Sequence, residues 1–236
     1  MSLAPGGTVS RFTSFALILL SLAACAPVDL AYGPWPVSLD RPPEGMSHEA
    51  WVHGLAAHEQ AREAGLTDRS LMAIIDYSRP ATQRRLWVID LATGDLLMHE
   101  HVAHAARTGG TWATSFSNAV GSYQSSLGTF ITANSYLGVR GLSLRLRGIE
   151  PGVNDNALRR GIVIHGTPNV TEARARAGRQ GRTEGCPAVP MESARQLVRL
   201  IEGGVVVFAW YPDRTFLARS SYLDHGQAAI RLSSSN

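Results

Sequence analysis

The sequence predicts a mainly β domain with a few helices, arranged as a β-sandwich or a barrel-like sheet. From residue 71 onward, short runs rich in β-branched and aromatic residues alternate with turn-forming residues. Only residues 48–64 and 191–202 have the composition or spacing of a helix. We expect the second helix to pack beside the loop that carries Cys186.

The first residues have the pattern of an export signal. Arg11 precedes the apolar run Phe12–Leu22, which is much shorter than the ~20 residues of a membrane span. The sequence Leu22-Ala23-Ala24-Cys25 resembles a bacterial lipobox, in which the thiol receives a lipid and the chain is cut before it. Residues 1–24 are therefore predicted to be a lipoprotein signal peptide. The alternative is a secretory signal with an incidental cysteine.

Lipidation of Cys25 would make the membrane a partner of the protein and hold it on the periplasmic side of the bacterial cell envelope. Ala26 stands where the aspartate associated with inner-membrane retention would be. The outer membrane is therefore the expected location.

Residues 25–46 are rich in proline and are predicted to form a linker. Ser47 is a candidate N-cap for a helix over residues 48–64, and Gly65 is suited to end it. Residues 47–70 are thus predicted to form an N-terminal helical arm.

The remaining chain supplies the expected sheet. Strands are predicted over residues 71–77, 86–91, 96–102, 128–132, 142–147, 162–165 and 205–210. Ala92-Thr93-Gly94-Asp95 is a hairpin signal, and the alternation in 142–147 places Arg145 and Arg147 on the face opposite three leucines. We expect one domain over residues 71–213, followed by a C-terminal tail over 214–236.

All 22 basic side chains are arginine, and the net charge is +3. Codon bias explains the absence of lysine more simply than function does. So modest a charge on an exported chain does not indicate a nucleic-acid partner. Arginine forks are suited instead to the carboxylates of cell-wall peptides.

Two residues point to nucleophilic chemistry. Cys186 is the one thiol outside the targeting signal, and His165 ends a predicted strand upstream of it. An imidazole can take the proton of a thiol whose ordinary pKa is near 8.5. We expect the Gly166 carbonyl to orient His165, and the amides of Gly185 and Cys186 to bind a developing oxyanion. A buried structural cysteine beside a strand-terminal histidine is the alternative.

The order and context of these residues resemble the L,D-transpeptidase family of the YkuD type, in the branch that ends in Gly-Cys-Pro-Ala. His165-Gly166 precedes Thr183-Glu184-Gly185-Cys186 at the spacing of that family. Further similar segments are Asp76-Tyr77-Ser78, residues 85–91, Val102-Ala103-His104, Phe116-Ser117-Asn118, residues 121–128 and Asn154-Asp155-Asn156-Ala157. The resemblance covers about residues 71–213 and implies that they form the catalytic domain.

The resemblance implies that Cys186 is the nucleophile and His165 the base. The thiolate would attack the diaminopimelate carbonyl of a peptidoglycan tetrapeptide stem and expel D-Ala. The acyl group would then pass to an amine, with no metal or cofactor. The same site would serve hydrolysis by an L,D-carboxypeptidase, and a non-catalytic wall-binding lipoprotein is the alternative from another class.

Two departures from the family pattern matter. Glu184 stands where most members have histidine, and a carboxylate beside the thiol would oppose thiolate formation, so we expect Glu184 to face solvent or an arginine. Pro187-Ala188 replaces the usual substrate anchor. Its role is assigned to Arg179 and Arg182 in an arginine-rich loop, although a solvated basic loop is an equal explanation.

Arg145 and Tyr136 complete the substrate-binding candidates, with Arg147 next in line. The rings of Trp87, Trp112 and Tyr136 fit core or flap positions better than sugar-stacking platforms. His99, Glu100, His101 and His104 do not form a tetrahedral metal set on a strand, so no metal site is predicted.

Overall fold

The computed structural model describes residues 1, 2 and 39–223. The predicted signal peptide, Cys25, most of the linker and residues 224–236 lie outside the described residues. Within the part that is described, no helix is both long and apolar enough to cross a membrane.

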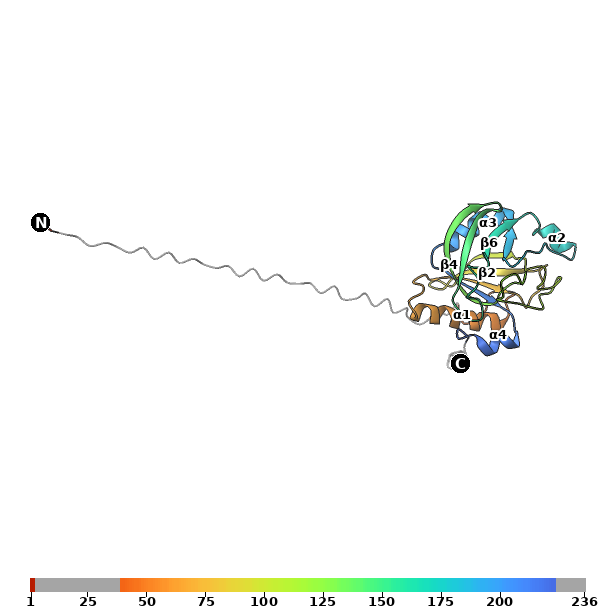
Figure 1. Ribbon diagram of the computed structural model, residues 1–236, viewed down its shortest axis with the longest axis horizontal. Helices are drawn as coiled ribbons and strands as arrows, with labels where there is room; N and C mark the ends of the chain where they lie inside the picture. Colours follow the sequence, from red (N-terminus) through yellow and green to blue (C-terminus); the bar gives the residue numbers. More distant parts are fainter. Residues whose placement is uncertain (3–38, 224–236) are drawn as a thin grey trace. The chain divides into compact units, whose positions relative to one another are not determined.

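Eight strands form a single sheet in the order β3-β2-β1-β8-β4-β5-β6-β7, and helices flank it (Figure 1). The elements are α1 (His48–Glu63), β1 (Leu71–Asp76), β2 (Arg84–Asp90), β3 (Asp95–His101), β4 (Gly128–Gly138), β5 (Gly141–Gly148), β6 (Val163–Thr167), α2 (Glu172–Arg176), β7 (Ala188–Pro190), α3 (Met191–Ile201), β8 (Val206–Trp210) and α4 (Arg214–Arg219). The predicted fold class is confirmed.

The sheet curls so that its two edges meet. Most neighbouring strands are antiparallel, whereas β1 with β8 and β6 with β7 are parallel. The residue Ala103, shortly after β3, forms a bridge to Ala188 of β7, with its amide 2.8 Å from the Ala188 carbonyl oxygen. This contact joins the first and last strands of the order, which gives the sheet a barrel-like closure.

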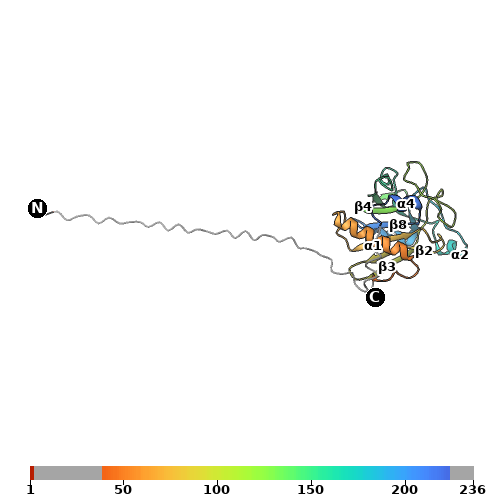
Figure 2. The ribbon, with the colours of Figure 1, turned by 90° about the horizontal axis from the view of Figure 1, so that it is seen from below.

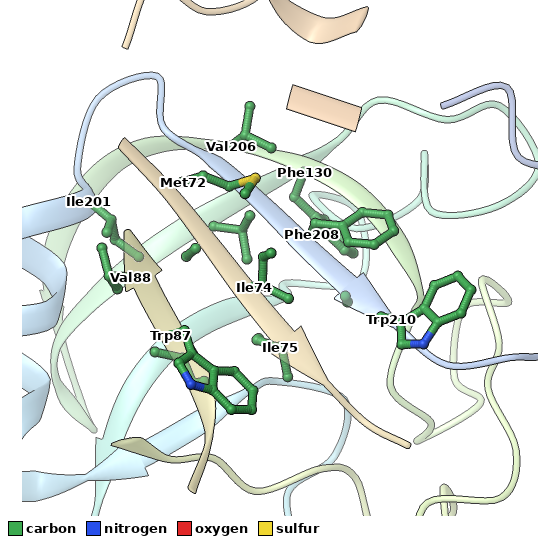
Figure 3. Packing of buried hydrophobic residues seen from close by; sticks show 14 of the residues in the cluster. Met72, Ile74, Ile75, Trp87, Val88, Phe130, Ile201, Val206, Phe208 and Trp210 are labelled. Atoms are coloured by element: carbon green, nitrogen blue, oxygen red, sulfur yellow. The ribbon is translucent and has the colours of Figure 1, made fainter. Parts of the chain in front are cut away.

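The core lies along β1 and β8, whose side chains are almost all buried (Figure 3). Gly54 allows α1 to approach this sheet closely, because a Cβ there would lie 2.6 Å from Ile74 Cδ1. Trp51 of the same helix is 1% exposed, and its indole donates to the Leu39 carbonyl at 3.0 Å. Figure 2 shows α1 lying across the strands. The expected N-terminal arm is thus packed into the domain core.

Three short elements differ from the sequence prediction. The segment after residue 213 was expected to be a tail, but it begins with α4, where Asp213 caps the helix by accepting from the Phe216 amide at 2.8 Å. Phe216 and Leu223 are buried, so residues 214–223 pack against the domain. The strand β7 and the helix α2 were also not predicted, because three and five residues are too few to show a periodic pattern.

Candidate active site

The strand β6 fixes the direction of His165. His165 pairs with Ser143 of β5 and is 1% exposed. Its neighbour Gly166 faces α3, where a Cβ would lie 2.8 Å from Ala194 Cβ and 3.0 Å from Met191 Sδ. Since successive residues of a strand point to opposite faces, His165 points away from α3. Figure 1 shows α3 beside β6.

A hydrogen bond sets the tautomer of His165. Its Nδ1 lies 2.9 Å from the Gly166 carbonyl oxygen. A carbonyl only accepts, so Nδ1 carries the proton and Nε2 keeps its lone pair. Burial lowers the pKa of His165, the bond to Gly166 raises it, and the charge of Arg140 lowers it further. The imidazole is therefore neutral near pH 7 and available as a base.

The parallel pairing of β6 with β7 brings Cys186 to this strand. His165 is opposite Ala188, so the thiol two residues earlier lies beside Val163. The Val163 amide approaches Sγ at 3.5 Å, and Sγ lies 3.7 Å from the Gly161 carbonyl oxygen. Cys186 is partly exposed. The structure thus places the Cys186 thiol, just before β7, against the strand that carries His165, with the thiol partly exposed.

The turn before the thiol is held by its own side chains. Thr183 Oγ1 donates to the Cys186 carbonyl at 2.6 Å and accepts from the Gly185 amide at 3.3 Å. Gly185 has φ +146°, and a Cβ there would lie 2.8 Å from Ile162 Cδ1, so only glycine fits. The Gly185 amide is therefore already engaged. The oxyanion role expected for it would require that contact to Thr183 to open.

Opposing influences act on the thiol. Burial raises the pKa of Cys186, whereas the Val163 amide and the charges of Arg140 and Arg160 lower it, and Glu184 raises it. Glu184 is exposed, as the sequence predicted, and its influence is the weakest of these. The thiol is protonated near pH 7, so thiol and imidazole are both neutral at rest.

Sequence reasoning missed Arg140 and Arg160. Arg140 lies at the tip of the hairpin between β4 and β5, and Arg160 immediately precedes the chain that leads into β6. The sequence features near them are the glycines that flank the hairpin tip, and the position of Arg160 five residues before His165. Neither feature distinguishes these two from the many exposed arginines.

Two of the predicted substrate-binding residues share a face of the sheet with His165. Tyr136 pairs with Ser143, which pairs in turn with His165, and Arg145 pairs with Val163. Cross-strand partners point to the same side. The Arg145 guanidinium lies 4.1 Å from the centre of the Tyr136 ring, a cation–π contact. These two residues therefore lie on the sheet face to which His165 points.

Arg179 and Arg182 line a separate pocket, which does not include His165 or Cys186. The pocket is lined by Ala106, Gly110, Thr111, Asn169, Arg174, Arg179, Gln180, Gly181 and Arg182. None of these lining residues is acidic, so the pocket is positively charged. Arg182 is exposed, and its Nη1 donates to the Gly109 carbonyl at 3.3 Å.

The aromatic and histidine residues considered for sugar stacking or metal binding lie in the core, on the surface or in contact with other side chains. Trp87 is fully buried and stacks on His99 at 4.7 Å, while Trp112 is 57% exposed. His101 contacts Glu172 at 3.1 Å, and His104 Nδ1 lies 2.8 Å from the Arg85 guanidinium. Within residues 39–223, no three histidine, cysteine or carboxylate side chains are grouped as a metal site.

This arrangement is suited to acyl transfer through a thioester. His165, a neutral base with a fixed tautomer, lies two residues along β6 from Val163, whose amide contacts the partly exposed thiol. A base and a thiol on the same strand are the components of nucleophilic catalysis by cysteine. Residues 43–210 match the family described as the L,D-transpeptidase catalytic domain. This match covers more than half of the chain. No curated protein matches the chain.

Solved structures of low sequence identity are also similar. An L,D-transpeptidase from Mycobacterium smegmatis is 10% identical with a TM-score of 0.39, and the match covers 60% of this chain and 59% of that one. The cell shape determining protein Pgp2 of Campylobacter jejuni is 12% identical with a TM-score of 0.41, over 76% of this chain and 61% of that one. The matches thus span about three fifths of these neighbours.

Proposed function

The chain belongs to the L,D-transpeptidase catalytic domain family, and we propose that it is a cysteine acyltransferase that remodels peptidoglycan. One observation carries this proposal. The imidazole of His165 is fixed by the Gly166 carbonyl with Nε2 unprotonated, on the strand that also contacts the Cys186 thiol.

The proposed reaction has two halves. His165 Nε2 accepts the thiol proton as Sγ attacks the diaminopimelate carbonyl of a tetrapeptide stem. The C–N bond to D-Ala breaks, and the imidazolium returns the proton to the departing amine, which leaves a thioester on Cys186. The amine of a second stem or of a protein then attacks the thioester, loses a proton to His165 and regenerates the thiol.

Water in place of the amine would give L,D-carboxypeptidase hydrolysis by the same residues. Because each half uses the same thiol and base, the acceptor alone decides between the two outcomes. We favour transfer because the family is named for it.

The pocket around Arg179 and Arg182 is proposed to hold carboxylates of the stem. It has three arginines and no acidic side chain among its lining residues. Charge-assisted hydrogen bonds from arginine guanidinium groups to carboxylates are among the stronger polar contacts in proteins. Arg145 and Tyr136, which share a face of the sheet with His165, are proposed to contact another part of the stem.

Anchoring by a lipid on Cys25, with export of the protein to the periplasmic face of the outer membrane, completes the proposal. It is supported by the sequence Leu22-Ala23-Ala24-Cys25. Cys25→Ser should move the protein from the membrane fraction to the soluble one. Mass spectrometry that found an unmodified Cys25 in the mature wild-type protein would contradict it.

The activity is tested by incubating purified protein with disaccharide-tetrapeptides. We expect release of D-Ala, together with a 3→3 cross-linked dimer, and Cys186→Ala should abolish both. Release of D-Ala without dimer would favour the carboxypeptidase. Labelling of Cys186 by a carbapenem separates an enzyme from a non-catalytic wall-binding lipoprotein, because a binding module has no need of an activated thiol.

A further inference from the structure

The side chain of Arg160 donates several hydrogen bonds close to the turn that precedes Cys186. Its guanidinium donates to the Ser117 carbonyl at 2.7 Å and to Ser122 Oγ at 3.2 Å. Further bonds reach the Gln124 carbonyl and Ser126 Oγ. All four partners are carbonyl or hydroxyl oxygens, so these hydrogen bonds orient the guanidinium without neutralising its charge.

In the described part of the chain, no carboxylate forms an ion pair with Arg160. Among residues 39–223, the ion pairs involve other arginines and His101. Arg160 is half-buried, and its hydrogen-bond partners are neutral. Solvent screens a half-buried charge less than an exposed one, so the guanidinium interacts more strongly with charges that form nearby.

The nearby group is the thiol. Arg160 Nη2 lies 3.5 Å from the position that a Cβ on Gly185 would occupy, next to Cys186 in the chain. Gly161, the residue after Arg160, offers its carbonyl oxygen at 3.7 Å from Sγ, and the Val163 amide approaches Sγ at 3.5 Å. Arg160 thus adjoins both backbone segments that surround the sulfur.

We propose that Arg160 is a positioning residue that holds a fixed positive charge beside Cys186 and stabilises its thiolate, while its hydrogen bonds to residues 117–126 keep the turn at Gly185 in place. The negative charge of exposed Glu184 acts in the opposite direction. The mutual influence of Arg160 and Cys186 on each other's pKa has the sign that this role requires.

The proposal rests on the proposed thiol chemistry but is tested without any peptidoglycan substrate. The rate of alkylation of Cys186 by iodoacetamide is measured against pH, because the midpoint of this profile reports the pKa of the thiol. The variants are Arg160→Gln and Arg160→Lys. Arg159→Gln is the control, since it removes the same charge from the exposed neighbouring residue.

We expect Arg160→Gln to raise the midpoint by about one pH unit. At neutral pH the thiolate fraction then falls about tenfold, but a more basic thiolate is a better nucleophile, so the alkylation rate should fall only about threefold. Arg160→Lys should keep the midpoint within about 0.3 unit of the wild type, because the charge is retained. Arg159→Gln should leave the profile unchanged.

A purely structural role gives a different result, because a displaced turn would lower the plateau rate at high pH in both variants without moving the midpoint. An unchanged midpoint in folded Arg160→Gln would overturn the proposal. If that variant did not fold, a midpoint raised by a full unit in Arg160→Lys would overturn it. A shifted midpoint in a protein that fails to release D-Ala would count against the proposed reaction while supporting the role of Arg160.

Discussion

The Nδ1 atom of His165 lies 2.9 Å from the carbonyl oxygen of Gly166, its neighbour in the chain. The bond uses no third side chain, so the orientation of the base depends on the backbone of β6. That backbone is held against α3 because Gly166 leaves no gap between strand and helix. Packing on one face of β6 therefore helps to hold the His165 imidazole on the other.

Gly166→Ala should disturb both packing and catalysis. The new Cβ would lie 2.8 Å from Ala194 Cβ and 3.0 Å from Met191 Sδ. Overpacking of this kind typically costs about 1–3 kcal/mol, measured by urea unfolding. The kcat for D-Ala release should fall as well, because β6 must move. Ala194→Gly in the same chain should recover part of the loss, and strict additivity of the two changes would contradict the proposed contact.

Arg140→Gln should move the whole pH profile of activity upward. The charge of Arg140 lowers the pKa of His165 and that of Cys186. Its removal raises both, so the acid limit, set by protonation of His165, and the basic limit, set by ionisation of Cys186, move to higher pH. For an exposed arginine we expect a few tenths of a pH unit in kcat/KM, decreasing with added salt.

The direction of that shift is the critical result. Removal of an exposed charge elsewhere, as in Arg195→Gln on α3, should leave the profile in place. Arg140→Gln could instead lower the pH of the acid limit, or move only one of the two pH limits. In either case the charge of Arg140 would not lower the pKa of both His165 and Cys186.

The sequence predicted what depends on local pattern. The alternation in 142–147 predicted β5, and the His165-Gly166 dipeptide predicted the bond that orients the imidazole. The influence of Arg140 and Arg160 on the pKa of Cys186 could not be predicted, because these arginines lie on a hairpin tip and a loop that only the folded sheet brings to Cys186. The engagement of the Gly185 amide by Thr183 likewise depends on a tertiary turn.

Stability should fall in mild acid through His104. Burial, together with the charge of Arg85, lowers the pKa of His104 to about 4. Nδ1 accepts from Arg85 at 2.8 Å, so protonation would place two cations in contact. The unfolded state binds this proton below about pH 6.5, so stability is complete above that pH and declines toward pH 4 by up to about 3 kcal/mol.

His104→Asn checks this contribution, because the amide oxygen of asparagine can accept from Arg85 but does not titrate. The free energy of unfolding should depend less steeply on pH in this variant between pH 6.5 and 4. Burial also lowers the pKa of His58 and His165, so some slope should persist. Parallel curves for the variant and the wild type would contradict the assignment.

The arginine pocket should contribute to substrate binding and leave thiol chemistry unchanged. Arg179 and Arg182 line the same pocket, away from the contacts of the sulfur. If each holds a carboxylate, Arg179→Ala and Arg182→Ala should each lose about 1.5–3 kcal/mol of binding, a ten- to hundredfold drop in kcat/KM expressed mainly in KM. Arg195→Ala, at an exposed position of α3, is the matched control and should cost far less.

Alkylation of Cys186 by a small neutral reagent should be the same in all three variants, because none of these charges is placed beside the thiol. Unaltered kinetics in both pocket variants would make this a solvated basic loop. The stem carboxylates would then be held next to His165, where Arg145 lies over Tyr136 and Arg147 follows on the same face of β5.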